Sequence, residues 1–127
     1  MDELKPRRAV VPSAPPVPLV VVAGCPAEFV AECRDAAARL GVLVRECDLR
    51  SLRVLMATSL PYAIIVMEDL YRFDPDAFDA IVRQSPASLM RIDPGEAHDP
   101  ESRRLLIDAV LESAAAEPSS GIRAFSR

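Results

Sequence analysis

The sequence has little of what most phosphate-binding and hydrolytic enzymes require. It contains four glycines and one histidine in 127 residues. It has neither a G-x-G-x-x-G segment nor a Walker A segment, and it lacks the G-x-S-x-G turn of serine hydrolases. His98, the only imidazole, has no partner residues at a zinc-binding spacing. The sequence therefore predicts a protein that is not an enzyme, with no cofactor and no metal ion.

Long apolar runs are also missing. No stretch approaches the roughly 20 apolar residues that a membrane-spanning helix needs. The chain starts with Asp2, Glu3 and prolines, where a signal peptide would have an apolar core. Cys25, Cys33 and Cys47 match no disulfide or metal-binding spacing, which is typical of a reducing compartment. We therefore expect a cytoplasmic protein with no membrane insertion.

The charge balance limits the kinds of partner. The formal net charge is -4 at neutral pH. Binding to nucleic acid without sequence preference needs a broad cationic surface, which an acidic chain does not provide. We therefore expect no nucleic-acid partner. Half of the residues are apolar, which is enough for one core in a chain of this length.

The distribution of proline divides the chain into one domain and two tails. We expect residues 1–18 to form a disordered, Pro-rich tail, because they contain little to bury. Pro12 and Pro15 have the spacing of a PxxP ligand, so the tail can be read as a ligand or as a linker. Residues 117–127 are small and polar and predict a flexible tail. Residues 19–116 are expected to form a single α/β domain.

Four apolar segments predict β-strands, at residues 19–23, 42–47, 62–67 and 87–92. The first and third are continuously apolar, as expected for strands that are buried on both faces of a parallel sheet. The second is less uniformly apolar, which favours an edge position.

Helical patterns separate these strands, at residues 26–40, 49–58, 75–84 and 100–116. Right-handed connections between strand, helix and strand imply a parallel sheet with helices on both faces. We predict a flavodoxin- or receiver-like three-layer sandwich with four parallel strands in the order 2-1-3-4. For the last helix, the predicted buried residues are Leu105, Leu106, Ala109, Val110 and Ser113.

Two segments resemble the receiver domains of response regulators. Residues 60–69, which read LPYAIIVMED, are similar to the receiver segment that ends in the phosphoacceptor aspartate. The sequence HDPE at residues 98–101, with the leucines that follow it, resembles the start of the last receiver helix. The resemblance covers about residues 19–116. It implies a receiver fold and a role in bacterial-type cytoplasmic signalling.

The residues that a working receiver uses for chemistry are replaced. Gly24 and Cys25 stand where an acidic pair would bind Mg²⁺, and Met67 stands at the phosphoacceptor position. Arg91 lies near the end of the fourth strand, where the resemblance calls for Thr or Ser, and the only lysine is Lys5. Phosphoryl transfer needs a metal and a cation that hold the transferred group. The sequence therefore predicts a shortened, non-catalytic pseudo-receiver.

The segment after the third strand is the predicted partner-binding site. Its residues are Glu68, Asp69, Leu70, Tyr71, Arg72 and Phe73. We interpret this segment as an exposed loop in which aromatic and charged groups lie together, as they do at interface hot spots. In the alternative interpretation, Tyr71 and Phe73 cover the core beneath the loop. The predicted partner is another protein, and a homodimer remains open.

Two other functions stay open from the sequence. Cys25 precedes a helix, where the macrodipole lowers a thiol pKa, and this would suit a small thiol-dependent or redox enzyme. Acids at the ends of the strands would instead form a ligand or metal site if they converged. These acids are Glu28, Asp48, Glu68, Asp69 and Asp93.

Overall fold

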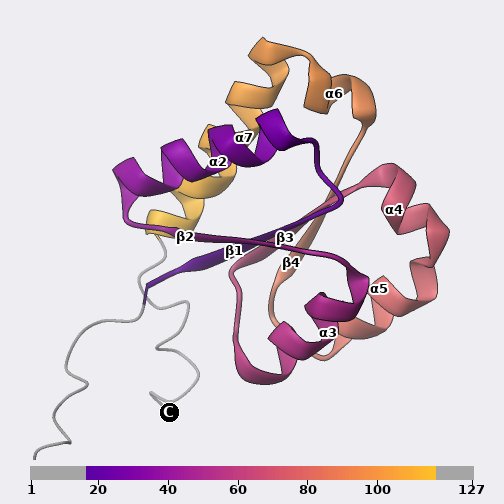
Figure 1. The fold of residues 1–127 in the computed structure, drawn as a ribbon. Coiled ribbons are helices and arrows are strands. Elements are labelled where there is room, and N and C mark those ends of the chain that lie inside the picture. The colour runs from indigo at the N-terminus through magenta and orange to yellow at the C-terminus, as the bar shows by residue number, and fades with distance from the viewer. Residues whose placement is uncertain (1–16, 117–127) are drawn as a thin grey trace, which may run out of the picture.

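A four-stranded parallel sheet lies at the centre of the structure, a computed structural model that describes residues 17–116 (Figure 1). The strands are β1 (Leu19–Ala23), β2 (Leu43–Cys47), β3 (Ala63–Met67) and β4 (Ser88–Ile92). Their order in the sheet is β2-β1-β3-β4, and every neighbouring pair is parallel. The predicted order 2-1-3-4 is confirmed. The expectations for residues 1–16 and 117–127 lie outside the described residues.

Helices cover both faces of the sheet. They are α2 (Ala27–Leu40), α3 (Leu49–Thr58), α4 (Glu68–Phe73), α5 (Pro75–Arg83), α6 (Pro94–His98) and α7 (Pro100–Ala116). In Figure 1, α2 and α7 lie on one face of the sheet, and α3, α4 and α5 lie on the other. This is the flavodoxin-like arrangement with four strands. None of the helices between residues 17 and 116 is long and apolar enough to cross a bilayer.

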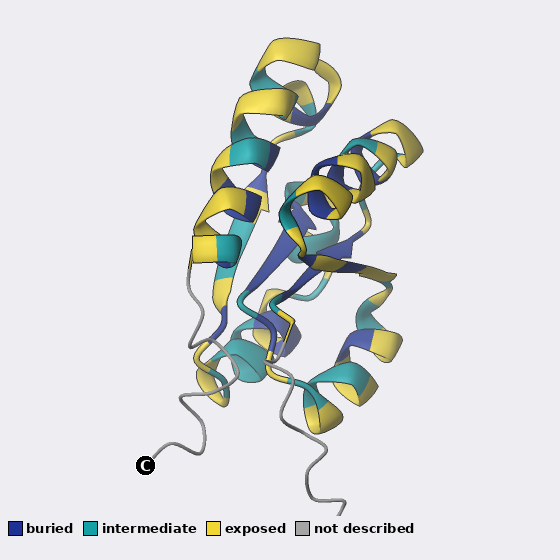
Figure 2. Ribbon diagram, turned by 90° about the vertical axis from the view of Figure 1, so that its left-hand side faces the viewer, coloured by how far each residue is buried: buried dark blue, intermediate teal, exposed yellow. Residues whose placement is uncertain are grey.

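The two central strands explain the apolar runs in the sequence. Val20 and Val22 of β1 pack towards α2 and α7, whereas Val21 packs towards α3 and α5. Strand β3 alternates in the same way, so all residues of both strands are buried. In Figure 2 the middle of the sheet is dark blue and the outward sides of the helices are yellow. Strand β2 lies at an edge and is partly exposed, as predicted.

Local signals define most helix ends. Gly41 ends α2 in the left-handed conformation at φ 74°, which glycine adopts without a steric cost. Asp48 begins α3 by accepting a hydrogen bond from the Ser51 amide at 2.8 Å. Asp74 caps α5 by accepting from the Ala77 amide, and Pro75 follows at the first helical position. These helices therefore begin and end close to the predicted residues.

Two short helices were not predicted. The segment 68–73, expected as a loop, is helix α4, so that expectation was wrong. The helical turn brings Arg72 within hydrogen-bonding distance of Glu68, four residues earlier. Helix α6 begins at a capping box, in which the Asp93 carboxylate accepts a hydrogen bond from the Gly95 amide and the Asp93 amide donates to the Glu96 carboxylate.

The buried side of α7 differs from the predicted one. Its buried residues are Ile107, Val110, Leu111 and Ala114. Of the five predicted residues only Val110 is buried, and Leu105 is 65 % exposed. The prediction failed because α7 carries apolar residues on two opposite sides, and packing against α2 and β1 selects one of them.

Candidate functional site

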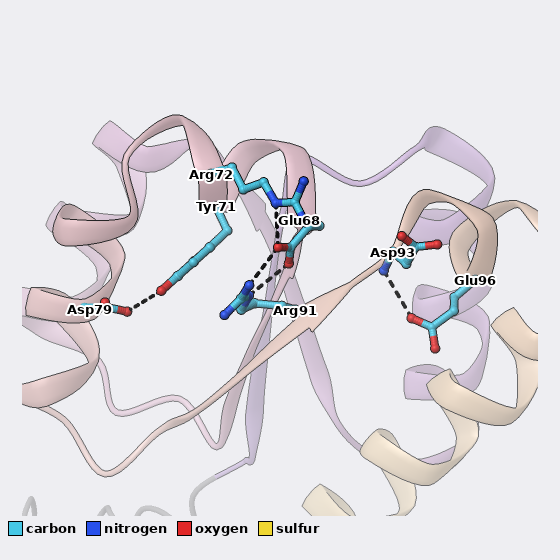
Figure 3. A network of polar contacts seen from close by, with 7 residues as sticks. All are labelled: Glu68, Tyr71, Arg72, Asp79, Arg91, Asp93 and Glu96. Carbon is cyan, nitrogen blue, oxygen red and sulfur yellow. Dashed lines mark hydrogen bonds and ion pairs between the residues drawn. The ribbon is translucent and has the colours of Figure 1, made fainter.

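The candidate site lies at the carboxyl ends of β3 and β4. Glu68 directly follows β3, and the strand register pairs Val66 with Arg91, which brings Arg91 beside Glu68. Arg91 donates to both carboxylate oxygens of Glu68, from Nε at 2.9 Å and from Nη2 at 2.7 Å. Arg72 donates to the same carboxylate from its Nε at 2.9 Å (Figure 3). One carboxylate therefore binds two guanidinium groups, and its bonds to Arg91 join α4 to β4.

The charge of Glu68 is fixed by these neighbours. Hydrogen bonds from Arg91, supported by those from Arg72, lower the pKa of Glu68 to about 2. Glu68 in turn raises the pKa of Arg91. The Glu68 side chain is 14 % exposed, and both of its oxygens accept hydrogen bonds from arginine. Glu68 is therefore ionised at neutral pH and neutralised within the fold.

Tyr71 is held on the inner side of α4. The guanidinium carbon of Arg91 lies 4.1 Å from the centre of its ring, within the range of a cation–π interaction. The Tyr71 hydroxyl donates to Oδ1 of Asp79 at 2.8 Å, and this bond is the main reason that the Tyr71 pKa is raised. The ring also contacts Phe78, with 5.9 Å between centroids. Tyr71 therefore covers the core, as the alternative interpretation proposed.

The structure divides the six predicted residues into two groups. Glu68, Leu70 and Tyr71 are partly buried and contact the domain. Asp69, Arg72 and Phe73 are exposed. Phe73 is 81 % exposed, so it does not cover the core. We call the exposed group, Asp69, Arg72 and Phe73, the outer face of α4.

Leu70 occupies the space at the end of β1. Gly24 has φ 71°, and a Cβ atom built on it would lie 2.9 Å from Cδ2 of Leu70. Leu70 also packs against the core on the α3 and α5 side of the sheet. Here an apolar side chain lies against glycine.

Cys25 does not have the properties of an activated thiol. It is half-buried, and its Sγ donates to the carbonyl oxygen of Ala23 at 3.7 Å. Burial raises the pKa of the Cys25 thiol to about 12, which is opposite to the direction expected from the sequence. Helix α2 begins at Ala27, with Pro26 as its N-cap. A thiol with this pKa contains very little nucleophilic thiolate at neutral pH.

The acids at the strand ends have separate local roles. Asp48 and Asp93 cap helices, and Glu68 is paired with arginine. Glu28 lies 4.0 Å from the imidazole of His98, and both side chains are more than half exposed. Within residues 17–116, no three His, Cys, Asp or Glu side chains are placed to share a metal ion.

Arg91 and Asp79 belong to the site although the sequence analysis did not include them in it. Arg91 contacts Glu68 and Tyr71, and Asp79 holds the Tyr71 hydroxyl. The strand order contains a usable signal for Arg91, because adjacent parallel strands place their carboxyl ends together. An acid after β3 and an arginine near the end of β4 are therefore expected neighbours. No such feature of the sequence indicates that Asp79 belongs to the site.

No family model, curated protein or solved structure matches this chain significantly.

Proposed function

We propose that the protein is a non-catalytic, receiver-like interaction domain of bacterial-type cytoplasmic signalling, and that it binds another protein through the outer face of α4. The observation that carries this proposal is the exposure of Phe73. Phe29 and Phe78 are fully buried, whereas Phe73 leaves 81 % of its surface in water. Phenylalanine and arginine are enriched in protein interfaces, and Arg72 lies beside Phe73.

The inner side of α4 supports its outer face. Glu68 is bonded to Arg91 on β4, and Tyr71 is bonded to Asp79 on α5. These contacts fix a helix of six residues that would be marginal in isolation. A preformed binding face loses less conformational entropy when a partner binds. The polar network thus serves to position Phe73.

The chemistry of the outer face indicates the kind of partner. The Phe73 ring would bury most of its area in an apolar pocket, which is the usual arrangement of a hot spot. Arg72 is 73 % exposed in its side chain and donates to Glu68 through Nε. A partner that offers an apolar pocket beside a carboxylate fits these two residues best.

Two features support a role without phosphoryl transfer. Leu70 lies against Gly24, at the end of β1 where the resemblance to receivers implies metal ligands. The carboxylate of Glu68, one residue after the phosphoacceptor position, is bonded to two arginines. A carboxylate held in this way is a poor ligand for Mg²⁺ and a poor nucleophile. The fold is proposed to keep the receiver shape as a platform for binding.

The test compares two matched pairs of exposed residues in the full chain. One variant carries Arg72→Ala and Phe73→Ala on α4. The control carries Arg104→Ala and Leu105→Ala on α7, where an exposed arginine again precedes an exposed apolar residue. Both variants and the wild type are immobilised, and proteins that bind from lysate of the source cells are identified and then purified for titration.

The proposal predicts that a partner of the wild type and of the α7 control loses affinity for the α4 variant by at least about tenfold, since hot-spot truncations cost 2 kcal/mol or more. Equal binding by the α4 variant would contradict the proposal. So would loss of binding in the α7 control alone.

A further inference from the structure

A groove crosses the end of the domain that lies opposite the candidate site. One part lies between α3 and α5, has a volume of about 360 Å³ and includes Ile81. The second part has a volume of about 550 Å³ and lies where β1 and β2 begin. Both parts share Met56, Ala57 and Leu60, so they are continuous. We call this surface the amino-end groove.

The amino-end groove gathers exposed apolar side chains. Val17, Leu43 and Leu60 line it and are 59 %, 45 % and 44 % exposed. They are half of the six large apolar side chains that are exposed among residues 17–116. Apolar side chains concentrated in one hollow mark a binding site more often than single exposed ones do.

The chain itself enters the domain at this groove. Val17 lines it, and the next residue, Pro18, accepts a hydrogen bond from the Leu43 amide at 2.9 Å. Residues 1–16 precede this point and include one aliphatic run, Ala9, Val10 and Val11. Val17 follows Val11 by six positions, a distance that in a polyproline-II conformation would be about 19 Å. Three neighbouring strands span only about 10 Å, so this length of chain is enough to cross the strand ends that border the groove.

We propose that the amino-end groove is a binding site for an extended aliphatic and proline-containing segment, and that its occupant is residues 9–12 of this same chain. Prolines at positions 12, 15, 16 and 18 lack a backbone donor, so the segment is unsuited to continue the sheet as a strand. It binds through side chains instead. Val10 and Val11 match the apolar lining, and Met56 is a side chain that adapts to its neighbours.

Attachment to the domain favours this occupant over a separate molecule. A tethered segment has an effective concentration in the millimolar range, so weak packing is enough to keep it bound. Prolines also limit the freedom of the unbound segment, which lowers the entropy lost on docking. The inference does not depend on the function proposed for α4, because the groove and the outer face of α4 share no residue.

The experiment uses methyl signals of the full chain in solution. One variant carries Val10→Asp and Val11→Asp. Its matched control carries Ser13→Asp and Ala14→Asp, which add the same charge to the same segment without removing a valine. The Leu60 and Met56 methyl signals should shift in the first variant and stay near their wild-type positions in the control. The shifts should not depend on protein concentration.

Melting temperatures supply a second measurement through a double-mutant cycle with Leu60→Asp. Val10→Asp with Val11→Asp should lower the melting temperature by a few degrees in the wild-type background. The same change should have little effect when Leu60→Asp has already disrupted the groove.

Unchanged groove methyl signals, or additive effects in the cycle, would overturn the proposal. Shifts that grow with protein concentration would also overturn it, because the occupant would then be the segment of a second copy.

Discussion

The two faces of the sheet differ in how completely they are packed. The face covered by α2 and α7 carries the larger cluster of buried residues, which includes Phe29, Ile107 and Leu111. The face covered by α3, α4 and α5 has a smaller buried cluster centred on Leu52 and Phe78. The amino-end groove and the exposed Phe73 both belong to this second side. One face therefore holds most of the core, whereas the other carries the amino-end groove and the outer face of α4, for which we propose binding roles.

Each face also has its own ion pair, in a different environment. On the first face, Arg103 donates to Glu32 at 2.6 Å and to the Ala97 carbonyl at 3.2 Å, with 15 % of the Arg103 side chain exposed. On the second, Arg91 holds Glu68 with 47 % of its side chain exposed. The bonds of Arg103 join helices α2, α6 and α7 to one another. The bonds of Arg91 to Glu68 hold the short surface helix α4 against β4. Substitutions at matched positions can therefore separate the two roles.

The largest difference is expected between two phenylalanines. Phe29→Ala should lower the free energy of unfolding by about 3–5 kcal/mol, because it leaves a cavity in the larger core. Phe73→Ala should change it by less than about 0.5 kcal/mol, because the ring is mostly in water. Denaturant unfolding of both variants measures the difference. Similar losses in the two variants would remove the distinction between the faces.

Two glycines with the same backbone conformation test the packing at the end of β1. Gly41→Ala should lower the free energy of unfolding by about 1–2 kcal/mol, because its φ of 74° is strained for alanine. No atom lies within 4 Å of the new methyl, so no steric overlap adds to this cost. Gly24→Ala should cost at least about 1 kcal/mol more, because the methyl overlaps Leu70. Unfolding measurements should show that adding Leu70→Ala makes the Gly24 substitution less costly. Equal costs for the two glycines would mean that Leu70 does not fill this space.

Substitutions of Arg103 on the first face and of Arg72 on the second are expected to differ in stability by a smaller amount. Arg103→Ala should destabilise the domain by about 1–3 kcal/mol, since it removes hydrogen bonds from a mostly buried charge pair. Arg72→Ala should cost at most about 0.5 kcal/mol, because its pair with Glu68 spans one turn of an exposed helix. Thermal and denaturant unfolding measure the stability loss of each variant. A larger stability loss in Arg72→Ala than in Arg103→Ala would show that α4 contributes more to stability than its exposure indicates.

The smallest expected effect is on the stability of the fold at acidic pH. The pKa of Glu68 is about 2 in the fold and ordinarily 4.5, so its pairing stabilises the folded state fully above pH 4.5. That contribution should disappear as the pH falls from 4.5 towards 2. The stability difference between the wild type and Glu68→Gln should therefore shrink over this range. Asp48 and Asp99 also have lowered pKa values, but their contribution is common to both proteins and cancels. A difference that is constant with pH would contradict the ion-pair account.

The sequence predicted the sheet well because its signals are local and redundant. The runs at β1 and β3 are apolar throughout, and Asp48, Asp74 and Gly41 mark helix ends by their own chemistry. Right-handed connections then leave few ways to arrange four parallel strands.

The errors arose where contacts between distant segments decide the structure. Helix α7 has apolar residues on two sides, and only its packing on α2 shows that Ile107 rather than Leu105 is buried. The site depends on Glu68 and Arg91, which are 23 residues apart in the chain. Tyr71 and Phe73 look equivalent in a segment expected as a loop, but in helix α4 residues two positions apart face nearly opposite sides, so Tyr71 reaches Asp79 while Phe73 is exposed.

Amide hydrogen exchange of the full chain, measured with and without the purified partner, locates the surface that the partner covers. Partner binding should slow exchange in residues 68–76 and leave α7 unchanged, because we assign recognition to the α4 side of the sheet. Slower exchange confined to α7, with none in residues 68–76, would contradict the assignment of binding to the outer face of α4.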